Sequence, residues 1–255
     1  MGAILTDVDA WVLWAGLAAA MVASWGAGWW LGGRLTKEGR EARADKFPDA
    51  SVALLGLLLG FTFSMALSKH DQRRLMVVTD SNALGDFYTC ASLVKEPVRG
   101  KLRTAIRVYV EHRLALATET LDAPTFEKNL AELVEMHGQM QGLVGEAVDG
   151  GTPVTVPLVN TLNEVTSSHA ARLAALRDRL PFSVVALLFL AAVVSMLLMG
   201  TQQGASKQAR PGEMIAFVFL VSMAIWVTLD LNQPQRGLIT VSQEPMQRLL
   251  AGMDK

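Results

Sequence analysis

Residues 54–74 read LLGLLLGFTFSMALSKHDQRR, and this stretch decides the fold. It begins as an apolar segment with a small residue at every fourth position, namely Gly56, Gly60, Ser64 and Ser68. It ends in charged residues, with no proline or glycine where the polarity changes. Because nothing breaks the helix at that junction, the stretch predicts a membrane-spanning helix that continues into an aqueous helical region.

The rest of the composition agrees with a membrane protein. The chain has 255 residues, of which 51% are hydrophobic and 18% are charged, whereas soluble domains carry about 25% charged residues. The deficit is confined to four windows, Trp11–Gly33, Ser51–Ser68, Phe182–Gly200 and Met214–Leu229. Each is long enough, or nearly so, to cross about 30 Å of hydrocarbon. The sequence therefore predicts an all-α membrane protein with four transmembrane helices.

Several classes of function are disfavoured by the sequence. The net charge of -1 gives no basic field for nucleic acid. The single cysteine, Cys90, excludes an internal disulfide and a cysteine-based metal cluster. We find no motif for a nucleophile–base pair, a metal site or a phosphate-binding loop. We therefore expect a protein that is not an enzyme, with no catalytic residues, no metal site and no cofactor.

The spans divide the chain into four parts. Residues 1–68 hold the first two transmembrane helices and a basic connecting loop; residues 69–181 form a helical extramembrane insert; residues 182–231 hold transmembrane helices three and four; and residues 232–255 form a C-terminal tail. Within the insert, Pro97 and Pro124 each open a helix, and Asp122 is a predicted N-cap. The last insert helix, from about Pro157 to Leu180, is expected to continue into the third span.

Apolar stripes at helical spacing run along the insert. One of them comprises Leu158, Leu162, Val165, His169, Leu173, Leu176 and Leu180. A second stripe contains His137. If these two helices pair, the imidazoles of His137 and His169 meet in the core, where they could sense pH or hold a metal with a third ligand. The alternative is two hydrogen-bonded core side chains.

Two further groups of polar residues carry alternative interpretations. Asp230 ends the fourth span, where it has an ion or proton role or, alternatively, caps the helix and forms a turn. Arginines at positions 99, 103 and 107 recur at every fourth residue. They attract anions or lipid headgroups or, alternatively, form a solvated face paired with Glu96 and Glu111.

The second span has two distinct faces. The stripe Ala53, Leu57, Phe61 and Met65 lies about 100° from the small-residue stripe. The first span repeats the small-residue spacing in Gly16, Ala20, Ser24, Gly28 and Gly32. Small residues let helix backbones approach closely in lipid, so we predict a tight helix or subunit seam. One stripe of the second span would then face a pore and the other a neighbour; alternatively, both pack within one helix bundle.

Two segments carry a family resemblance. Residues 58–88, LLGFTFSMALSKHDQRRLMVVTDSNALGDFY, and residues 230–245, DLNQPQRGLITVSQEP, resemble the bacterial bestrophin-like domain family, whose activity is not established. More distantly, the chain resembles bestrophins, pentameric anion channels whose second span lines a hydrophobic neck. The resemblance implies that Phe61 occupies the neck, with Leu57 and Ala53 one and two turns earlier. Ala53 is smaller than the bulky apolar residue of those channels.

The resemblance and the composition together give a functional expectation. We expect an oligomeric ion (anion) channel in the bacterial inner (plasma) membrane, with the lipid bilayer, further copies of the chain and a small inorganic ion as partners. The alternative is a non-conducting, membrane-anchored helical sensor or interaction module. Basic residues between Arg34 and Ala50 favour a cytoplasmic loop, which places the insert 69–181 on the periplasmic side. The resemblance to bestrophins implies the opposite side.

Overall fold

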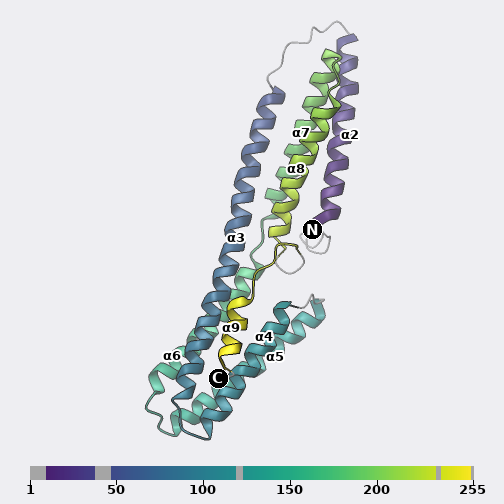
Figure 1. Ribbon diagram of the computed structural model, residues 1–255. Helices are drawn as coiled ribbons and strands as arrows, with labels where there is room; N and C mark the ends of the chain where they lie inside the picture. Colours follow the sequence, from purple (N-terminus) through teal and green to yellow (C-terminus); the bar gives the residue numbers. More distant parts are fainter. Residues whose placement is uncertain (1–9, 38–46, 119–122, 234–236, 254–255) are drawn as a thin grey trace. The chain divides into compact units, whose positions relative to one another are not determined.

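The computed structural model describes residues 10–37, 47–118, 123–233 and 237–253. In these ranges every regular element is an α-helix (Figure 1). The helices are α2 (Ala10–Lys37), α3 (Phe47–Ser92), α4 (Val98–Thr118), α5 (Ala123–Asp149), α6 (Thr155–Arg177), α7 (Phe182–Ser206), α8 (Pro211–Leu231) and α9 (Glu244–Met253). Four of them, α2, α3, α7 and α8, are long and apolar enough to cross a membrane. The predicted all-α class with four apolar candidate spans is confirmed.

The chain forms two compact units. The first contains the residues up to His70 together with Arg179–Ile239, and the second contains Asp71–Asp178 together with the residues from Thr240 onward. The segment 232–255, predicted as a single tail, is therefore divided between the units. Its second part includes α9, which packs against α4.

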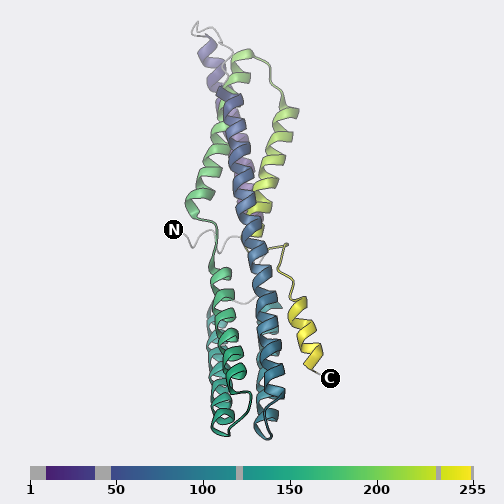
Figure 2. The ribbon, with the colours of Figure 1, turned by 90° about the vertical axis from the view of Figure 1, so that its left-hand side faces the viewer.

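Helix α3 is the element that the opening stretch of sequence predicts. It runs for 46 residues without a break and passes from apolar to charged sequence inside one helix (Figure 2). Its residues up to His70 belong to the first unit and those from Asp71 to the second. No proline or glycine lies between Ser68 and Arg74, and the helix continues through this segment.

The predicted continuity between the last insert helix and the third span is wrong. Helix α6 ends at Arg177, and α7 begins only at Phe182, directly after Pro181. Proline has no N–H to donate and disfavours helical backbone in the residue before it. The guanidinium of Arg73 also caps the end of α6, because its Nε and Nη2 donate to the carbonyls of Ala175 (3.1 Å) and Asp178 (2.8 Å).

In the first unit, α2 and α7 lie side by side in very close contact (Figure 1). Gly28 and Gly32 of α2 abut the α7 backbone, and Gly200 and Gly204 of α7 abut the carbonyls of Trp25 and Trp29. A methyl group at any of these four glycines would collide with the facing backbone. The later part of the predicted small-residue series, Gly28 and Gly32, thus makes a tight seam, and its partner is the third span, which carries glycines at the same spacing. Gly16 and Ala20 are exposed and lie outside the seam.

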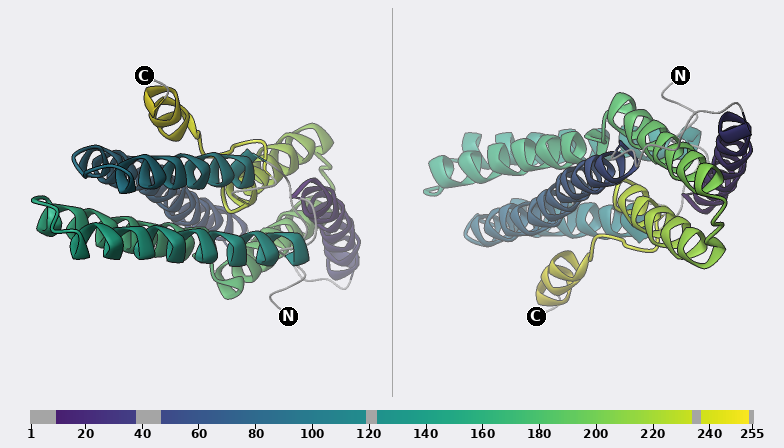
Figure 3. Two further views of the ribbon diagram at one scale, coloured as in Figure 1. Left: turned by 90° about the horizontal axis from the view of Figure 1, so that it is seen from below. Right: turned by 90° about the horizontal axis from the view of Figure 1, so that it is seen from above.

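The second unit has its own apolar core. Helix α4 packs against α5, and α5 packs against α6 (Figure 3). The core is built from large side chains that are almost fully buried: Leu84, Phe87, Leu102, Ile106, Tyr109, Met140, Leu158 and Met246. Met246 belongs to α9, and the Tyr88 hydroxyl donates to the Met253 carbonyl at 3.2 Å. The short C-terminal helix is therefore part of this core.

The glycine seam gives a matched test. We expect Gly204→Ala to destabilise the protein by about 1–3 kcal/mol, because the added methyl group has no room beside the Trp29 carbonyl. Gly26→Ala is the control, since no heavy atom lies within 4 Å of its added carbon and alanine favours the helix. Thermal unfolding of both purified variants in detergent provides the comparison. Equal unfolding temperatures would contradict the seam.

Candidate functional site

The predicted pore-facing stripe of α3 is not covered by the first unit. Phe61 is 63% exposed, Leu57 57% and Met65 42%, and Ala53 is exposed as well. The opposite side of the same helix is buried, with Leu55, Thr62 and Ala66 each at most 5% exposed. Only one face of this part of α3 therefore contacts the other helices of its unit.

The predicted packing stripe of α3 is also uncovered. Gly56, Gly60, Ser64 and Ser68 are exposed, and no heavy atom lies within 4 Å of a carbon added at either glycine. This contrasts with Gly28 and Gly32 of α2, whose seam is filled by α7. The packing role of the four α3 residues stays a prediction about contacts outside the single chain.

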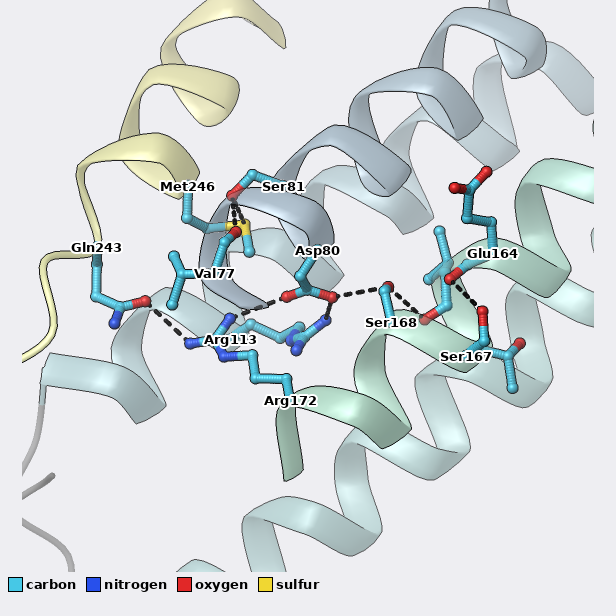
Figure 4. A network of polar contacts seen from close by, with 12 residues as sticks. Val77, Asp80, Ser81, Arg113, Glu164, Ser167, Ser168, Arg172, Gln243 and Met246 are labelled. Carbon is cyan, nitrogen blue, oxygen red and sulfur yellow. Dashed lines mark hydrogen bonds and ion pairs between the residues drawn. The ribbon is translucent and has the colours of Figure 1, made fainter. Parts of the chain in front are cut away.

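In the second unit, the structure reveals a buried ionic cluster centred on Asp80 of α3 (Figure 4). Its Oδ1 accepts a hydrogen bond from Nη1 of Arg113 in α4 at 2.8 Å, and its Oδ2 accepts one from Nη1 of Arg172 in α6 at 2.9 Å. The Ser168 hydroxyl lies 3.1 Å from Oδ1, and Arg172 Nη2 donates to Gln243 Oε1 at 2.9 Å. Side chains of three helices thus meet at one carboxylate, and Arg172 links the segment before α9 to it.

The cluster is a set of buried ion pairs that join helices. Two guanidinium groups face one carboxylate, and both the Asp80 and Arg113 side chains are at most 4% exposed. Burial lowers the pKa of Arg172, and the charge of neighbouring Arg113 lowers it further. Buried charges need partners, because removal of one leaves the others desolvated and unpaired. The arrangement holds helices together and presents no activated nucleophile.

The cluster was not predicted from the sequence, although Asp80 lies in the segment that carries the family resemblance. The signal is the register of α3, in which Asp80 falls within the buried series Arg73, Val77, Asp80, Leu84, Phe87 and Ala91. In α6 the buried series is Leu158, Leu162, Val165, Ser168, Arg172 and Ala175. The predicted stripe continued four residues after Val165, whereas the buried series continues after three. It therefore contained His169, Leu173 and Leu176 in place of the true core positions.

The two predicted histidines flank the cluster. His137 Nε2 is 2.9 Å from the Thr166 hydroxyl, whereas His169 Nδ1 is buried without a hydrogen-bond partner. Burial lowers the pKa of both imidazoles, followed by the positive charge of Arg113, and for His169 the pKa falls to about 4. Both rings are therefore neutral at pH 7. No group of three metal-ligating side chains forms in the described parts of the chain.

Asp230 organises the turn after α8. Its side chain is 3% exposed, and its carboxylate oxygens accept hydrogen bonds from the backbone N–H groups of Leu238 and Ile239, both at 2.9 Å. Gly237 lies so close that a side chain there would contact Asp230. Asn232 Oδ1 accepts from the Leu180 N–H at 2.8 Å. The geometry matches the turn-forming alternative for Asp230.

The row of arginines on α4 matches the alternative of a paired, solvated face. Arg99 pairs with Glu96 at 2.8 Å, and Arg107 pairs with Glu111 at 2.9 Å. Arg103 donates through Nε and Nη2 to the hydroxyl oxygen of Tyr88 at 2.8 and 2.6 Å. All three guanidinium groups therefore have local partners.

The fold and the comparisons define the class of protein. The protein is an all-α, multi-pass membrane protein, as its long apolar helices, the closely packed α2–α7 pair and the second helical unit indicate. Residues 11–246 match the model of the Bestrophin-like domain, and the chain belongs to that family. A solved crystal structure of a membrane protein shares the fold, with a TM-score of 0.66 and 14% identity over 94% of this chain and 96% of that one. No curated protein matches the sequence.

From the buried cluster we expect a large loss of stability on a small substitution. We expect Asp80→Asn to lower stability by about 3–5 kcal/mol, because it leaves two buried guanidinium groups without a charged partner. The control, Glu111→Gln, removes an exposed pair and should cost less than about 0.5 kcal/mol. Thermal unfolding measures both. A similar loss in the two variants would show that the cluster does not fasten the unit.

From the lowered pKa of His169 we expect a loss of stability in acid. The folded-state pKa of His169 is about 4, below the ordinary value near 6.5, so its contribution is complete above pH 6.5 and is lost as the pH falls towards 4. Since the ring is partly solvated, we expect the loss to be only about 1–2 kcal/mol. His169→Gln should flatten this part of the stability profile, whereas the exposed control Asn163→Ala should keep the wild-type slope. An unchanged profile in His169→Gln would refute the assignment.

Proposed function

We propose that this protein assembles from several copies of the chain into an ion channel, with the first part of α3 lining the path. The observation that carries the proposal is the uncovered stripe Ala53, Leu57, Phe61 and Met65 in a helix whose other side is buried. An apolar ring of this kind gates ions by dewetting, without charged side chains. No charged residue occurs between Ala50 and Ser68.

The neighbouring small-residue stripe supports assembly over simple contact with lipid. Lipid tails cover any apolar face, but glycine at every fourth position specifically permits the close approach of another backbone. In this chain another backbone occupies the space beside the glycines where α2 meets α7, whereas no heavy atom lies within 4 Å of a carbon added at Gly56 or Gly60. A second copy is the partner that would use it. Small inorganic anions are the proposed permeant species, by analogy with the bestrophin channels.

A groove in the second unit favours the alternative of a non-conducting interaction module. The groove lies between α3 and α9 and is lined by residues that include Val78, Asn82, Asp86, Arg248 and Leu249. Its mixed apolar and charged lining is suited to a protein segment. Native mass measurement separates the two functions: a monomer would remove the channel proposal, while a ring of copies would support it.

For the location we propose the bacterial inner membrane, with the residues between α3 and α7 on the periplasmic side. The support is the positive-inside rule, applied to the basic residues between Arg34 and Lys46 and to Lys207 and Arg210. Single cysteines at the exposed positions Gln141 and Gln202, in a Cys90→Ser background, can be labelled with an impermeant reagent. Labelling of Gln202→Cys alone in intact cells would reverse the assignment.

The pore proposal predicts opposite behaviour of two phenylalanines in one helix. Phe61→Ala should raise ion flux through reconstituted vesicles severalfold, because it widens an apolar constriction. Phe63→Ala makes the same chemical change about 200° around α3 and should leave flux unchanged. Flux that is absent in every variant, or equally altered in both, would contradict a pore lined by the Phe61 stripe.

A further inference from the structure

The ends of α2 and α7 in the first unit carry a stacked arginine that the pore proposal does not use. The Arg34 guanidinium carbon lies 3.7 Å from the centre of the Trp30 ring, and Trp30 is an exposed residue. Lys207 follows the end of α7 and is also exposed. We propose that this end of the α2–α7 pair binds the phosphate headgroup of an anionic phospholipid, with Arg34 and Lys207 as the cations.

The depth of Arg34 fits a headgroup. Trp11 and Trp30, nineteen positions apart in α2, are about 28 Å apart along the axis, which is close to the hydrocarbon thickness. Tryptophans gather at both boundaries of the hydrocarbon, so these two mark the interfaces. Arg34 lies one further turn, about 6 Å, beyond Trp30. That places its guanidinium among the phosphates of the bilayer.

Lys207 lies at the same depth as Arg34. A carbon added at Gly32 would meet the backbone of both Thr201 and Ala205, and one added at Gly33 would lie 3.9 Å from the Gly204 carbonyl oxygen, so the two helices are in register at this level. Arg34 follows Gly32 by two residues, and Lys207 follows Ala205 by two residues. The close seam therefore brings two cations from adjacent helices to one level of the membrane.

The stacking of Arg34 suits phosphate binding. A cation–π contact engages the face of the guanidinium and holds it against the Trp30 ring. The N–H donors lie in the plane of the group and point away from its face, so the stacked guanidinium still presents its edge. Bidentate N–H···O bonds to phosphate use that edge. Neutral headgroups offer the same phosphate but add a cation, which the second charge at Lys207 disfavours.

The backbone of Lys207 is an independent sign of function. It adopts the left-handed conformation, with φ 53° and ψ 23°, at the C-cap of α7, where glycine is the favoured residue. A side chain there costs roughly 1 kcal/mol or more. Strain retained at one position is a reason to look for a role of its side chain.

Nearby Arg210 is held differently and supplies the control. Its Nη1 pairs with Glu213 Oε1 at 3.2 Å, and its backbone N–H donates to Gln203 Oε1 at 3.3 Å. The same Gln203 oxygen accepts from the Trp25 indole N–H at 3.2 Å. Arg210 therefore belongs to the loop between α7 and α8 and has the same charge as Arg34 without the exposed stack.

Native mass spectrometry of the full chain in detergent tests the site, with phosphatidylglycerol and phosphatidylcholine as the added lipids. We expect the wild-type protein to prefer phosphatidylglycerol. Arg34→Ala and Lys207→Gly should each weaken that binding about fivefold, in line with the value of one basic residue near a charged surface, and leave phosphatidylcholine unaffected. Arg210→Ala should change it less than twofold.

Two outcomes would overturn the proposal. An equal loss in Arg210→Ala and Arg34→Ala would show that the effect is diffuse surface charge and not a site. Unchanged binding in Lys207→Gly would show that the lysine is structural. The same variant guards against a folding artefact, because glycine relieves the left-handed strain and should raise the unfolding temperature while lipid affinity falls.

Discussion

The second unit depends on one carboxylate. Asp80 has no exposed surface, and its two oxygens take the guanidinium groups of Arg113 and Arg172, which come from two other helices. Van der Waals packing of leucines and valines is tolerant of sliding, whereas a buried carboxylate accepts donors only in defined directions. The cluster therefore sets the register of α3, α4 and α6 relative to one another. Through Arg172 and Gln243 it extends that control to the segment that leads into α9.

The first unit is organised by a different principle. In its α2–α7 pair the glycines let two backbones touch, and side-chain hydrogen bonds such as Trp25 to Gln203 add to the contact. In lipid, where no hydrophobic effect joins helices, such close packing is a main source of attraction. Helix α3 uses one face for its own unit and leaves the other two stripes open. The glycine seam of α2 is thus covered by α7, whereas the small-residue stripe of α3 is covered by no helix of the unit.

Much of this fold is local enough to be predicted from the sequence. The four spans follow from runs of apolar residues, and the unbroken α3 follows from the missing breaker after Ser68. The turn at Asp230 is also local, since its hydrogen-bond donors lie eight and nine residues away. The partner of the α2 glycines was not predictable in this way, because the spacing that permits close approach does not name the helix that approaches.

Asp80 shows why the candidate site was harder to predict than the spans. An aspartate within an apolar stripe looks like a surface residue until its partners are known, and Arg172 lies 92 residues further along the chain. Ser168 and Arg172 lie in the core because the buried series steps three residues after Val165. A four-residue step leads instead to His169, Leu173 and Leu176, a series that looks more apolar. Whether a charged residue is buried depends on its partners in the tertiary structure. Hydrophobic periodicity contains no information on those partners and therefore assigns charged residues to the surface.

The pairing of α2 with α7 has a consequence for how the protein is made. Gly28 and Gly200 are separated by 172 residues, so at about 5–20 residues per second the first span waits roughly 10–35 s for its partner to be synthesised. During that interval Ser24, whose hydroxyl donates to the Val193 carbonyl in the finished protein at 2.8 Å, must bond within its own helix. The first span must therefore persist in the membrane without its α7 partner until translation reaches residue 204.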